Sequence, residues 1–541
     1  MPTRRQFLAH TATLAAAASA SWLGYRHLNR PPSIHINRVG LPLGHLLRDR
    51  QLPLTPSRRA QCNILILGSG AAALTAAWQL NKLGQRDFLI AEGFERNGNN
   101  AAYTVSGSLQ APTGAHYLAQ PSRESQDVRT LLRDLNILQH EMPDGKLVLK
   151  DTDLVHAPDE RVFHQNTWHD GLQIQDADSK RFFQIIDSLK NAYGSDGRKI
   201  FAIPIALSSS DPKWRELDTL TFATWLKSQG FTSPNLLWYL DYCCRDDYGQ
   251  GIKQVSAFAG LHYFAARGND HAAVLTWADG LNHLSEKIRQ FIQLEALNQF
   301  PNHAEWTFRQ PASLAASALQ IVEHADGVNA VLRHNQSGEI IEIKAKKLIC
   351  AIPLMIAARI IAEPQRYGFT GKLPESAPWL VSNFVLHSFP NELKNSELAW
   401  DNVVYGSRGL GYVVATHQDI RLAKPEISAF TAYAALNHDT PQNVRKWLLN
   451  ANEADLLDIA AQDLLTVYGK RFWQHVSHID LTVRAHAMAV PQVGYLNDKI
   501  LINLRNHHSR IVFAHSDLSG YSVFEEAAFW GAEAARKIQA A

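Results

Sequence analysis

QCNILILGSGAAALTAAW, residues 61–78, is the stretch that decides the fold. The apolar run at 64–67 predicts a strand covered on both faces, and a short glycine turn then leads into an alanine-rich helical pattern. Gly68 permits the turn, Gly70 lets a pyrophosphate approach the backbone, and Ala73 lets helix and strand pack closely. The free N–H groups at the helix start would face an anion, so the order of elements predicts a dinucleotide site. The residues expected at the cofactor are Gly68, Ser69, Gly70, Ala71, Ala72 and Ala73.

An acidic residue closes the next predicted strand. Residues 88–91 have a buried strand pattern, and Glu92 follows them, 24 positions after Gly68. In a dinucleotide-binding fold a carboxylate at this place accepts hydrogen bonds from a ribose diol. A glycine turn before a helix is common, but the strand, the helix and the acid together favour a cofactor site over a purely structural turn.

The residues after Glu92 resemble the flavin amine oxidase superfamily. In that superfamily the acid is followed by an Arg-x-Gly-Gly-Arg turn that lies along the FAD diphosphate, and residues 93–100 here read GFERNGNN. Arg96 and Gly98 match the turn, whereas Asn97 and Asn99 depart from it. The resemblance implies that Arg96, Gly98 and Asn99 bind the cofactor, and that this cofactor is FAD rather than NAD.

A second matching stretch is PTGAHYL at 112–118. In the superfamily a Gly-Ala-x-aromatic stretch passes the isoalloxazine ring, so Gly114 and Ala115 are implied at the flavin. His116 or Tyr117 would then point toward the substrate, and His116 is the expected catalytic residue of the two. The alternative reading is that His116 is a buried histidine with a local hydrogen bond.

Two later stretches extend the resemblance. Residues 348–353 read LICAIP, a buried strand closed by Ala-x-Pro as in the superfamily, and the edge strand expected at 317–321 would place Ala318 at the adenine. Near the C-terminus, a strand at 510–517 ends in Asp517, which is implied at the ribityl chain. Ser522 and Val523 would begin a final helix directed at the flavin, and Tyr521 is implied as a catalytic aromatic wall beside it. His515 and Ser516 replace the usual glycine.

A lysine that many amine oxidases use near flavin N5 is missing. The corresponding stretch 380–386 reads LVSNFVL, and the nearest lysines are Lys372 and Lys394. The electrons would therefore pass to oxygen or to a periplasmic carrier, and the missing lysine favours the carrier.

Two adjacent acids, Asp246 and Asp247, close a predicted helix at 236–242, which follows another at 217–226. They could face a cationic substrate, but the preferred interpretation is that they cap the helix or pair with Arg245. The four cysteines form no metal or redox motif.

The N-terminus has the pattern of a targeting signal. TRRQFL at 3–8, followed by the modest apolar run at 11–23, is similar to a twin-arginine export signal and predicts passage through the twin-arginine translocase to the periplasm, with the signal cleaved or kept as a tether. The alternative is an ordinary basic N-terminus with a membrane anchor, although the run is short for a transmembrane helix. Residues 26–59 are arginine- and proline-rich and predict a basic linker between signal and domain, partly docked through 39–47.

Composition agrees with an enzyme of ordinary type. A chain of 541 residues with 46% hydrophobic content can bury a core large enough for two intertwined domains, and a net charge of +2 gives no basis for nucleic-acid binding. We expect an α/β fold, with a Rossmann-like FAD-binding domain and a discontinuous substrate domain of mixed sheet plus helices. The expected ranges are 1–25 for the signal, 26–59 for the linker, 60–120, 271–360 and 496–541 for the FAD-binding domain, and 121–270 and 361–495 for the substrate domain.

The resemblance implies an FAD-dependent oxidoreductase. It would remove a hydride from an amine or a related small organic substrate and deliver it to flavin N5. Two alternatives stay open: a desaturase-like or isomerase-like flavoprotein acting on an apolar substrate, and a non-catalytic exported FAD-binding protein.

Overall fold

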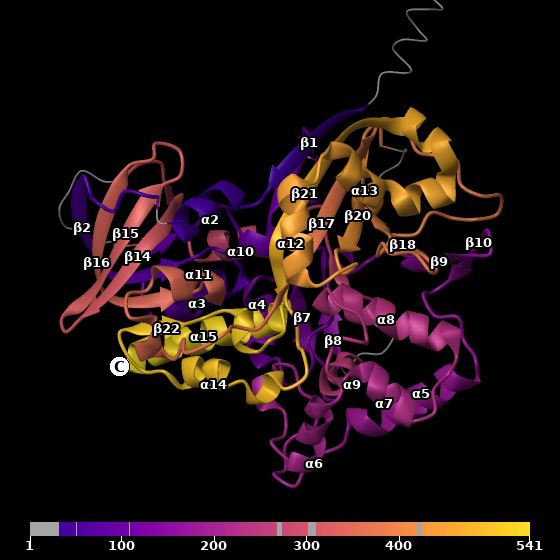
Figure 1. Ribbon diagram of the computed structural model, residues 1–541, viewed down its shortest axis with the longest axis horizontal. Coiled ribbons are helices and arrows are strands. Elements are labelled where there is room, and N and C mark those ends of the chain that lie inside the picture. The colour runs from indigo at the N-terminus through magenta and orange to yellow at the C-terminus, as the bar shows by residue number, and fades with distance from the viewer. Residues whose placement is uncertain are drawn as a thin grey trace, which may run out of the picture.

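The computed structural model shows two lobes built on two large sheets (Figure 1). It describes residues 32–49, 51–107, 109–267, 273–300, 310–418 and 425–540, so the expected export signal lies outside the described residues. Over those ranges, no helix has both the length and the apolar character needed to cross a membrane.

The first lobe is organised around β2 (Arg58–Leu67), which is the predicted first strand. It pairs in parallel with β3 (Phe88–Ala91) on one side and with β16 (Ile340–Cys350) on the other. This confirms that the Ala-x-Pro strand returns to the sheet that carries Glu92. The remaining strands of this cofactor sheet are β12 (Glu295–Leu297), β13 (Ala312–Leu314), β14 (Ala316–His324), β15 (Gly327–His334) and β22 (Ile511–Phe513).

Helices α3 (Ala71–Lys82) and α15 (Phe524–Ala540) pack closely in this lobe. A Cβ built on Gly531 would lie 2.3 Å from the carbonyl oxygen of Ala72, so only glycine permits this approach. The helix after the first glycine turn and the last helix of the chain therefore share one core. Three further helices belong to this lobe: α10 (Asn282–Phe291), α11 (Leu354–Ile360) and α14 (Lys499–Asn506).

The second lobe contains the other large sheet, with strand order β1-β21-β17-β20-β19-β18-β9-β10. Strands β18 and β19 form a hairpin across 406–411, and Thr440 caps α12 (Pro441–Asn450). Helix α13 (Glu453–Tyr468) packs with α12 on one face of the sheet (Figure 1). The strands are β1 (Ser33–Arg38), β21 (Val476–Ala489), β17 (Ser376–Leu386), β20 (Ser428–Ala435), β19 (Tyr412–Val414), β18 (Asp401–Val404), β9 (Glu160–His164) and β10 (Thr167–Asp170).

A helical layer extends the second lobe, in magenta at the lower right of Figure 1. The helix predicted at 236–242 is longer than expected, because α8 (Pro234–Tyr248) ends only at Gly249, whose φ is +66°. The helix predicted at 217–226 begins later than expected, at Phe222, and Thr221 caps its N-terminus. The helices here are α5 (Ala177–Lys190), α6 (Pro212–Arg215), α7 (Phe222–Ser228), α8 and α9 (Ala257–Ala265).

Two boundaries differ from the sequence-based expectation. The linker docks through 39–47 as expected, in α2 (Leu41–Arg48), but the docked part is longer than expected, because β1 also pairs with the second sheet. Residues 126–149, expected in the substrate domain, instead share the core of α3 and α15, because the apolar face of α4 (Gln126–Asp134) is buried there.

The remaining strands are short: β4 (Ala102–Ser106), β5 (Leu109–Pro112), β6 (Tyr117–Leu118), β7 (Leu138–Glu141), β8 (Leu147–Leu149) and β11 (Leu275–Thr276).

Candidate functional site

The glycine turn between β2 and α3 has the geometry of a phosphate-binding turn. Gly68 has a φ of +100°, and a Cβ there would lie 2.5 Å from the carbonyl oxygen of Ala351. A Cβ on Gly70 would meet no heavy atom within 4 Å, so the space beside this backbone is open. Ser69 donates its hydroxyl to the carbonyl oxygen of Glu92 at 2.9 Å, which ties the turn to the end of β3.

The three alanines after this turn differ in burial. Ala71 is half-buried at the start of α3 and lies beside the open space. The side chains of Ala72 and Ala73 are buried in the core that α3 shares with α15, and their predicted backbone contact with a cofactor stays a prediction.

Glu92 belongs to a network that the sequence did not reveal. Arg289, on α10, forms a buried ion pair with Glu92 at 2.6 Å and donates Nε to the side-chain oxygen of Asn97 at 2.9 Å. The second amino group of Arg289, Nη2, is buried without a hydrogen-bond partner. Asn97 has a φ of +64°, so this departure from the superfamily turn adopts the left-handed conformation and holds Arg289.

The turn at 96–100 packs directly on the glycine turn. A Cβ on Gly98 would lie 3.3 Å from Cα of Gly70, as expected for two turns that share a ligand. Arg96, however, is half exposed and paired with Glu286 at 2.7 Å. Arg96, which was predicted to contact a phosphate, is therefore paired with a residue of α10 in this structure.

The stretch expected at the flavin ring lies against the same turn. The N–H of Ala115 donates to the carbonyl oxygen of Asn99 at 2.8 Å, and a Cβ on Gly114 would lie 2.1 Å from that oxygen. Asn99 also donates its side-chain amide to the carbonyl oxygen of Ala487 on β21 at 2.7 Å. The turn expected at the diphosphate and the stretch expected at the flavin ring are thus in contact.

Arg484, on β21 of the second lobe, holds these motifs together. It is buried and donates Nε to the carbonyl oxygen of Thr113 at 2.7 Å. Its two amino groups contact the Glu95 carboxylate at 2.7 and 3.0 Å and the side-chain oxygen of Asn99 at 3.1 Å. A lone arginine in the otherwise apolar strand pattern LTVRA was the only sequence signal for this residue.

The C-terminal motif lies at the edge of the cofactor sheet. Asp517 follows β22 in a short turn and accepts the N–H of Leu354, at the start of α11, at 3.0 Å. Burial raises the pKa of Asp517, but the neighbouring His515 at 3.3 Å and this hydrogen bond outweigh it and hold the pKa below its ordinary value. Ser522 accepts the N–H of Ala489 on β21 at 2.8 Å, so the start of α15 is tied to the second lobe.

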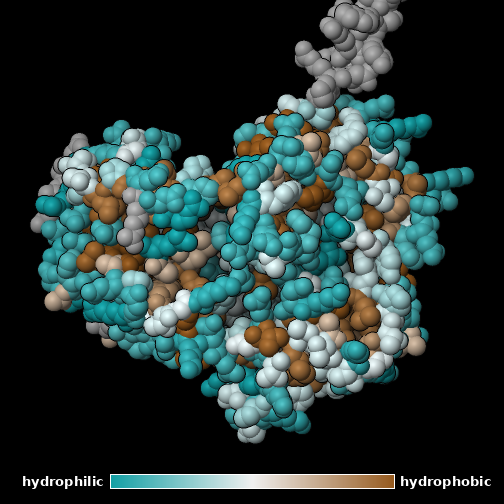
Figure 2. All heavy atoms as spheres, in the orientation of Figure 1, coloured by the Kyte–Doolittle hydropathy of each residue, from teal (hydrophilic) through white to brown (hydrophobic). Residues whose placement is uncertain are grey.

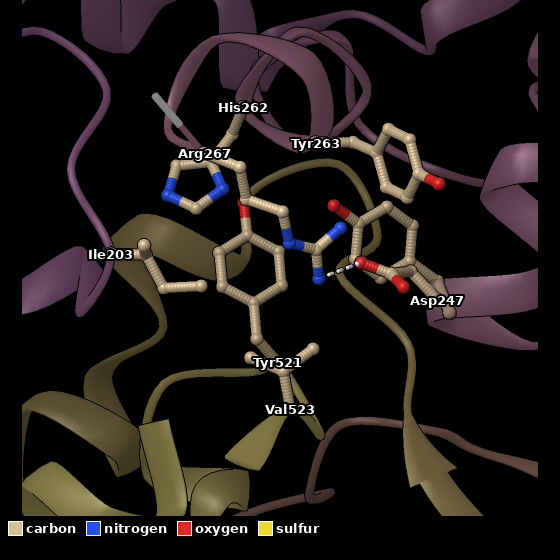
Figure 3. Close-up of a pocket in the computed structure, with 8 residues that line it drawn as sticks. Ile203, Asp247, His262, Tyr263, Arg267, Tyr521 and Val523 are labelled. Carbon is tan, nitrogen blue, oxygen red and sulfur yellow. Dashed lines mark hydrogen bonds and ion pairs between the residues drawn. The ribbon is translucent and has the colours of Figure 1, made fainter. Parts of the chain in front are cut away.

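Tyr521, predicted to form an aromatic wall beside the flavin, lies among other aromatic side chains. Its ring is 1% exposed and stacks between Tyr248 and His262 at centroid distances of 5.5 and 4.9 Å (Figure 3). Its hydroxyl contacts that of Tyr495 at 2.5 Å. Because the chain after Gly520 turns the ring into the helical layer, Tyr521 is a core residue there. It lines, with Val523, a cavity of about 10 Å³, enough for roughly one water molecule.

His116 instead lies among aromatic rings of the second sheet. It stacks on Tyr433 at 4.4 Å and lies 5.6 Å from Trp400. Burial lowers the pKa of His116 to about 3, so the imidazole is neutral near pH 7. Tyr117, next along the chain, donates its hydroxyl to Asp246 at 3.3 Å. Neither Tyr433 nor Trp400 was predicted, because their contact with His116 depends on how the two lobes meet.

Two carboxyl groups beside these rings have raised pKa values. Burial first, and the neighbouring Asp247 second, raise the pKa of Asp246 to about 7. Burial, then Glu160 and Asp246, raise the pKa of Asp401 well above its ordinary value. Across the residues that the structure describes, neither Asp246 nor Asp401 forms an ion pair.

The preferred pairing with Arg245 was wrong. Arg245 pairs with Asp241 at 3.1 Å, and Asp247 pairs with Arg267 at 2.7 Å (Figure 3). Asp246 instead accepts the hydroxyl of Tyr117, whose ring belongs to the aromatic group formed by His116, Tyr117, Trp400 and Tyr433.

The stretch expected to carry a lysine, 380–386, contains a buried asparagine in the middle of β17. Asn383 on β17 is fully buried, donates to the carbonyl oxygen of Pro112 at 2.9 Å and accepts the hydroxyl of Thr431 at 2.6 Å. Its polar atoms are thus used within the protein, next to the stretch that continues to Gly114.

Comparison with known proteins identifies the fold. The pattern of an NAD(P)-binding Rossmann-like domain matches residues 66–135. Putrescine oxidase bound to putrescine matches 89% of this chain and 100% of its own with a TM-score of 0.60 and 14% identity. The chain has the two-domain amine oxidase fold.

Other solved structures share the amine oxidase fold. Cyclohexylamine oxidase from Brevibacterium oxydans IH-35A is 16% identical, with a TM-score of 0.56 over 88% of this chain and 98% of its own. A CLA-producing fatty acid isomerase from P. acnes is 14% identical, with a TM-score of 0.57 over 87% and 97%. No curated protein sequence matches the chain. At these identities the likeness establishes the fold alone.

Proposed function

We propose that the chain is an FAD-dependent oxidoreductase that oxidises a cationic amine. The observation that carries the amine is the pair Asp246 and Asp401, two half-buried carboxyl groups that form no ion pair among the described residues and lie beside aromatic rings. Charge buried without a partner is costly, and a positively charged substrate would supply the missing partner. Aromatic faces such as Tyr433 and Trp400 also attract ammonium groups.

The residues present fit an ADP-bearing flavin. The open side of Gly70 admits a diphosphate, Glu92 stands where a ribose diol would bind, and α15 begins where the amine oxidase fold brings the chain back to the first turn. Gly68, Ser69 and Gly70 would hold the diphosphate, while Gly114, Ala115 and Val523 would border the ring. When bound, FAD supplies the acceptor for two electrons and a hydride.

The protein side chains would bind and orient the amine. Asp246 and Asp401 attract the ammonium group, and the rings of His116, Tyr117, Trp400 and Tyr433 exclude water around it. His116 would stay neutral, because burial depresses its pKa, so it would shape the site without repelling a cation. An amine that has lost its proton can donate a hydride without a further base.

We also propose that the electrons leave to a periplasmic carrier instead of oxygen. Asn383 stands in the strand where the superfamily carries its lysine, and both ends of its amide are already used. A periplasmic location, reached through the twin-arginine translocase, rests on residues 3–23, which precede the described part of the chain.

Anaerobic mixing of the FAD-loaded protein with putrescine, cyclohexylamine and linoleic acid tests this proposal. An amine should bleach the flavin, and Asp246→Asn should slow bleaching by the amine far more than Asp187→Asn, a change at an exposed acid on α5. Absence of bleaching with every amine would overturn the proposal. Conversion of linoleic acid without net bleaching would instead favour an isomerase, the second candidate, which the fold shared with the fatty acid isomerase supports.

A further inference from the structure

Residues 33–48 cross from one lobe to the other and form what we call the N-terminal clasp. Its first part, β1, extends the second sheet by pairing in parallel with β21 from Ser33 opposite His478 to Arg38 opposite Val483. Arg38 then donates its two amino groups to the carbonyl oxygens of Leu448 and Ala451, each at 2.6 Å. These two oxygens belong to the end of α12, so β1 is fastened at two places to the second lobe.

The second part of the clasp, α2, lies on the cofactor lobe. Leu43 and Leu47 pack against Leu319, Val331 and Ile340, which belong to the three strands at one edge of the cofactor sheet. The two lobes are separated by a notch in the space-filling view (Figure 2), and the clasp joins them (Figure 1).

Gly40 makes the crossing possible. It has a φ of +67°, and a Cβ there would lie 2.7 Å from the ring of Phe94. The chain therefore turns in direct contact with the segment that follows Glu92.

The clasp contacts chain neighbours of both residues expected at the adenosine. Phe94 is two positions after Glu92, and Leu319 follows Ala318. These two segments are themselves joined, because the N–H groups of Glu92 and Gly93 donate to carbonyl oxygens of 314 and 316 at 2.9 Å each. Gly40 contacts one segment and α2 contacts the other, so the clasp borders the adenosine end of the site from outside.

The clasp is attached without being part of either core. None of the residues of β1 or α2 is fully buried, whereas β2 and α3 are largely buried. Segments that bury little apolar surface open locally at a lower free energy than the core unfolds. The clasp can therefore open while both lobes stay folded.

We propose that the N-terminal clasp closes the adenosine end of the dinucleotide site and retains FAD, so that cofactor release requires the clasp to open. This inference rests on the proposed function, because it takes FAD as the occupant. It assigns to residues 33–48 a binding role that the glycine motifs do not cover.

The test compares FAD release from the chain 32–541, which keeps the clasp, with release from the chain 50–541, which lacks it. Flavin fluorescence on dilution gives the dissociation rate, and we expect release at least about tenfold faster from 50–541, equivalent to about 1.4 kcal/mol of retention. Equal release rates from the two chains would overturn the proposal.

A point substitution tests the same idea in a chain of full length. N–H groups of a parallel edge strand reach its partner at every second residue, and Val39 donates to the carbonyl oxygen of Val483 at 3.1 Å. Asn37 is therefore a position where proline removes a bond to β21, and Asn37→Ala keeps it. We expect faster FAD release for Asn37→Pro and an unchanged rate for Asn37→Ala.

Amide hydrogen exchange across 479–483, recorded without FAD, makes the two proposals separable. Faster exchange in Asn37→Pro shows that the clasp has opened, and FAD release unchanged in that variant would contradict the clasp. If the chain 32–541 binds no FAD while exchange still reports a docked clasp, the proposed function fails and the retention role fails with it.

Discussion

Asp246→Asn should make the ligand-free protein more stable at alkaline pH while weakening its hold on a cation. Because burial raises the pKa of Asp246 from 3.8 to about 7, the native state keeps a proton that the unfolded state has lost between those values. Stability therefore falls as pH rises from about 4 to about 7, and the loss is complete above the native pKa. At about 1.36 kcal/mol for each pKa unit, the ceiling of this loss is about 4 kcal/mol.

Asparagine removes the charge and keeps an oxygen that can accept the Tyr117 hydroxyl. The urea midpoint of the variant should exceed that of the unaltered protein at about pH 8, and the gain should shrink by more than half at about pH 5. Asp187→Asn, at an exposed acid, should show no such gain. A variant that is less stable at pH 8, or a gain that does not vary with pH, would refute the argument that Asp246 carries buried, uncompensated charge.

Three further outcomes follow from the packing. Gly531→Leu should lower stability by about 1–3 kcal/mol in thermal melts, because its side chain would strike the carbonyl oxygen of Ala72 and separate the helices. Arg484→Ala should cost about 3–5 kcal/mol in urea unfolding, since it leaves Glu95 without its partner, and Arg484→Lys should not restore it. His116→Gln should leave the shape of the activity–pH profile unchanged above about pH 5, because the pKa of His116 is about 3. Loss of one limb of that profile in the variant would contradict this prediction.

Local patterns in the sequence predicted the first glycine turn and its neighbours well. The strand before Gly68, the helix after it and the acid at Glu92 are consecutive in the chain, and short-range sterics decide each of them. The strand ending near Ala351 was also predicted, because its apolar run and its proline are local signals.

Residues that act across the fold could not be predicted in this way. Arg289 meets Glu92 across 197 positions, and Arg484 meets Glu95 across 389, so neither contact leaves a local pattern. Tyr521 was placed by its motif, but a motif names the residue after Gly520 and does not fix which way the ring turns. The clasp was predicted as a linker docked only through 39–47, because its composition is basic and proline-rich and the pairing of β1 with β21 joins residues far apart in the chain.

The central claim is that the open turn at Gly68–Gly70 and the carboxylate of Glu92 hold a flavin by its ADP half, while the start of α15 borders its ring. Titration of the cofactor-free chain with FAD and, separately, with FMN tests it most directly, because FMN carries the same ring but lacks the adenosine. The account predicts one FAD bound per chain and FMN bound far more weakly. Equal binding of the two flavins, or binding of neither, would contradict it.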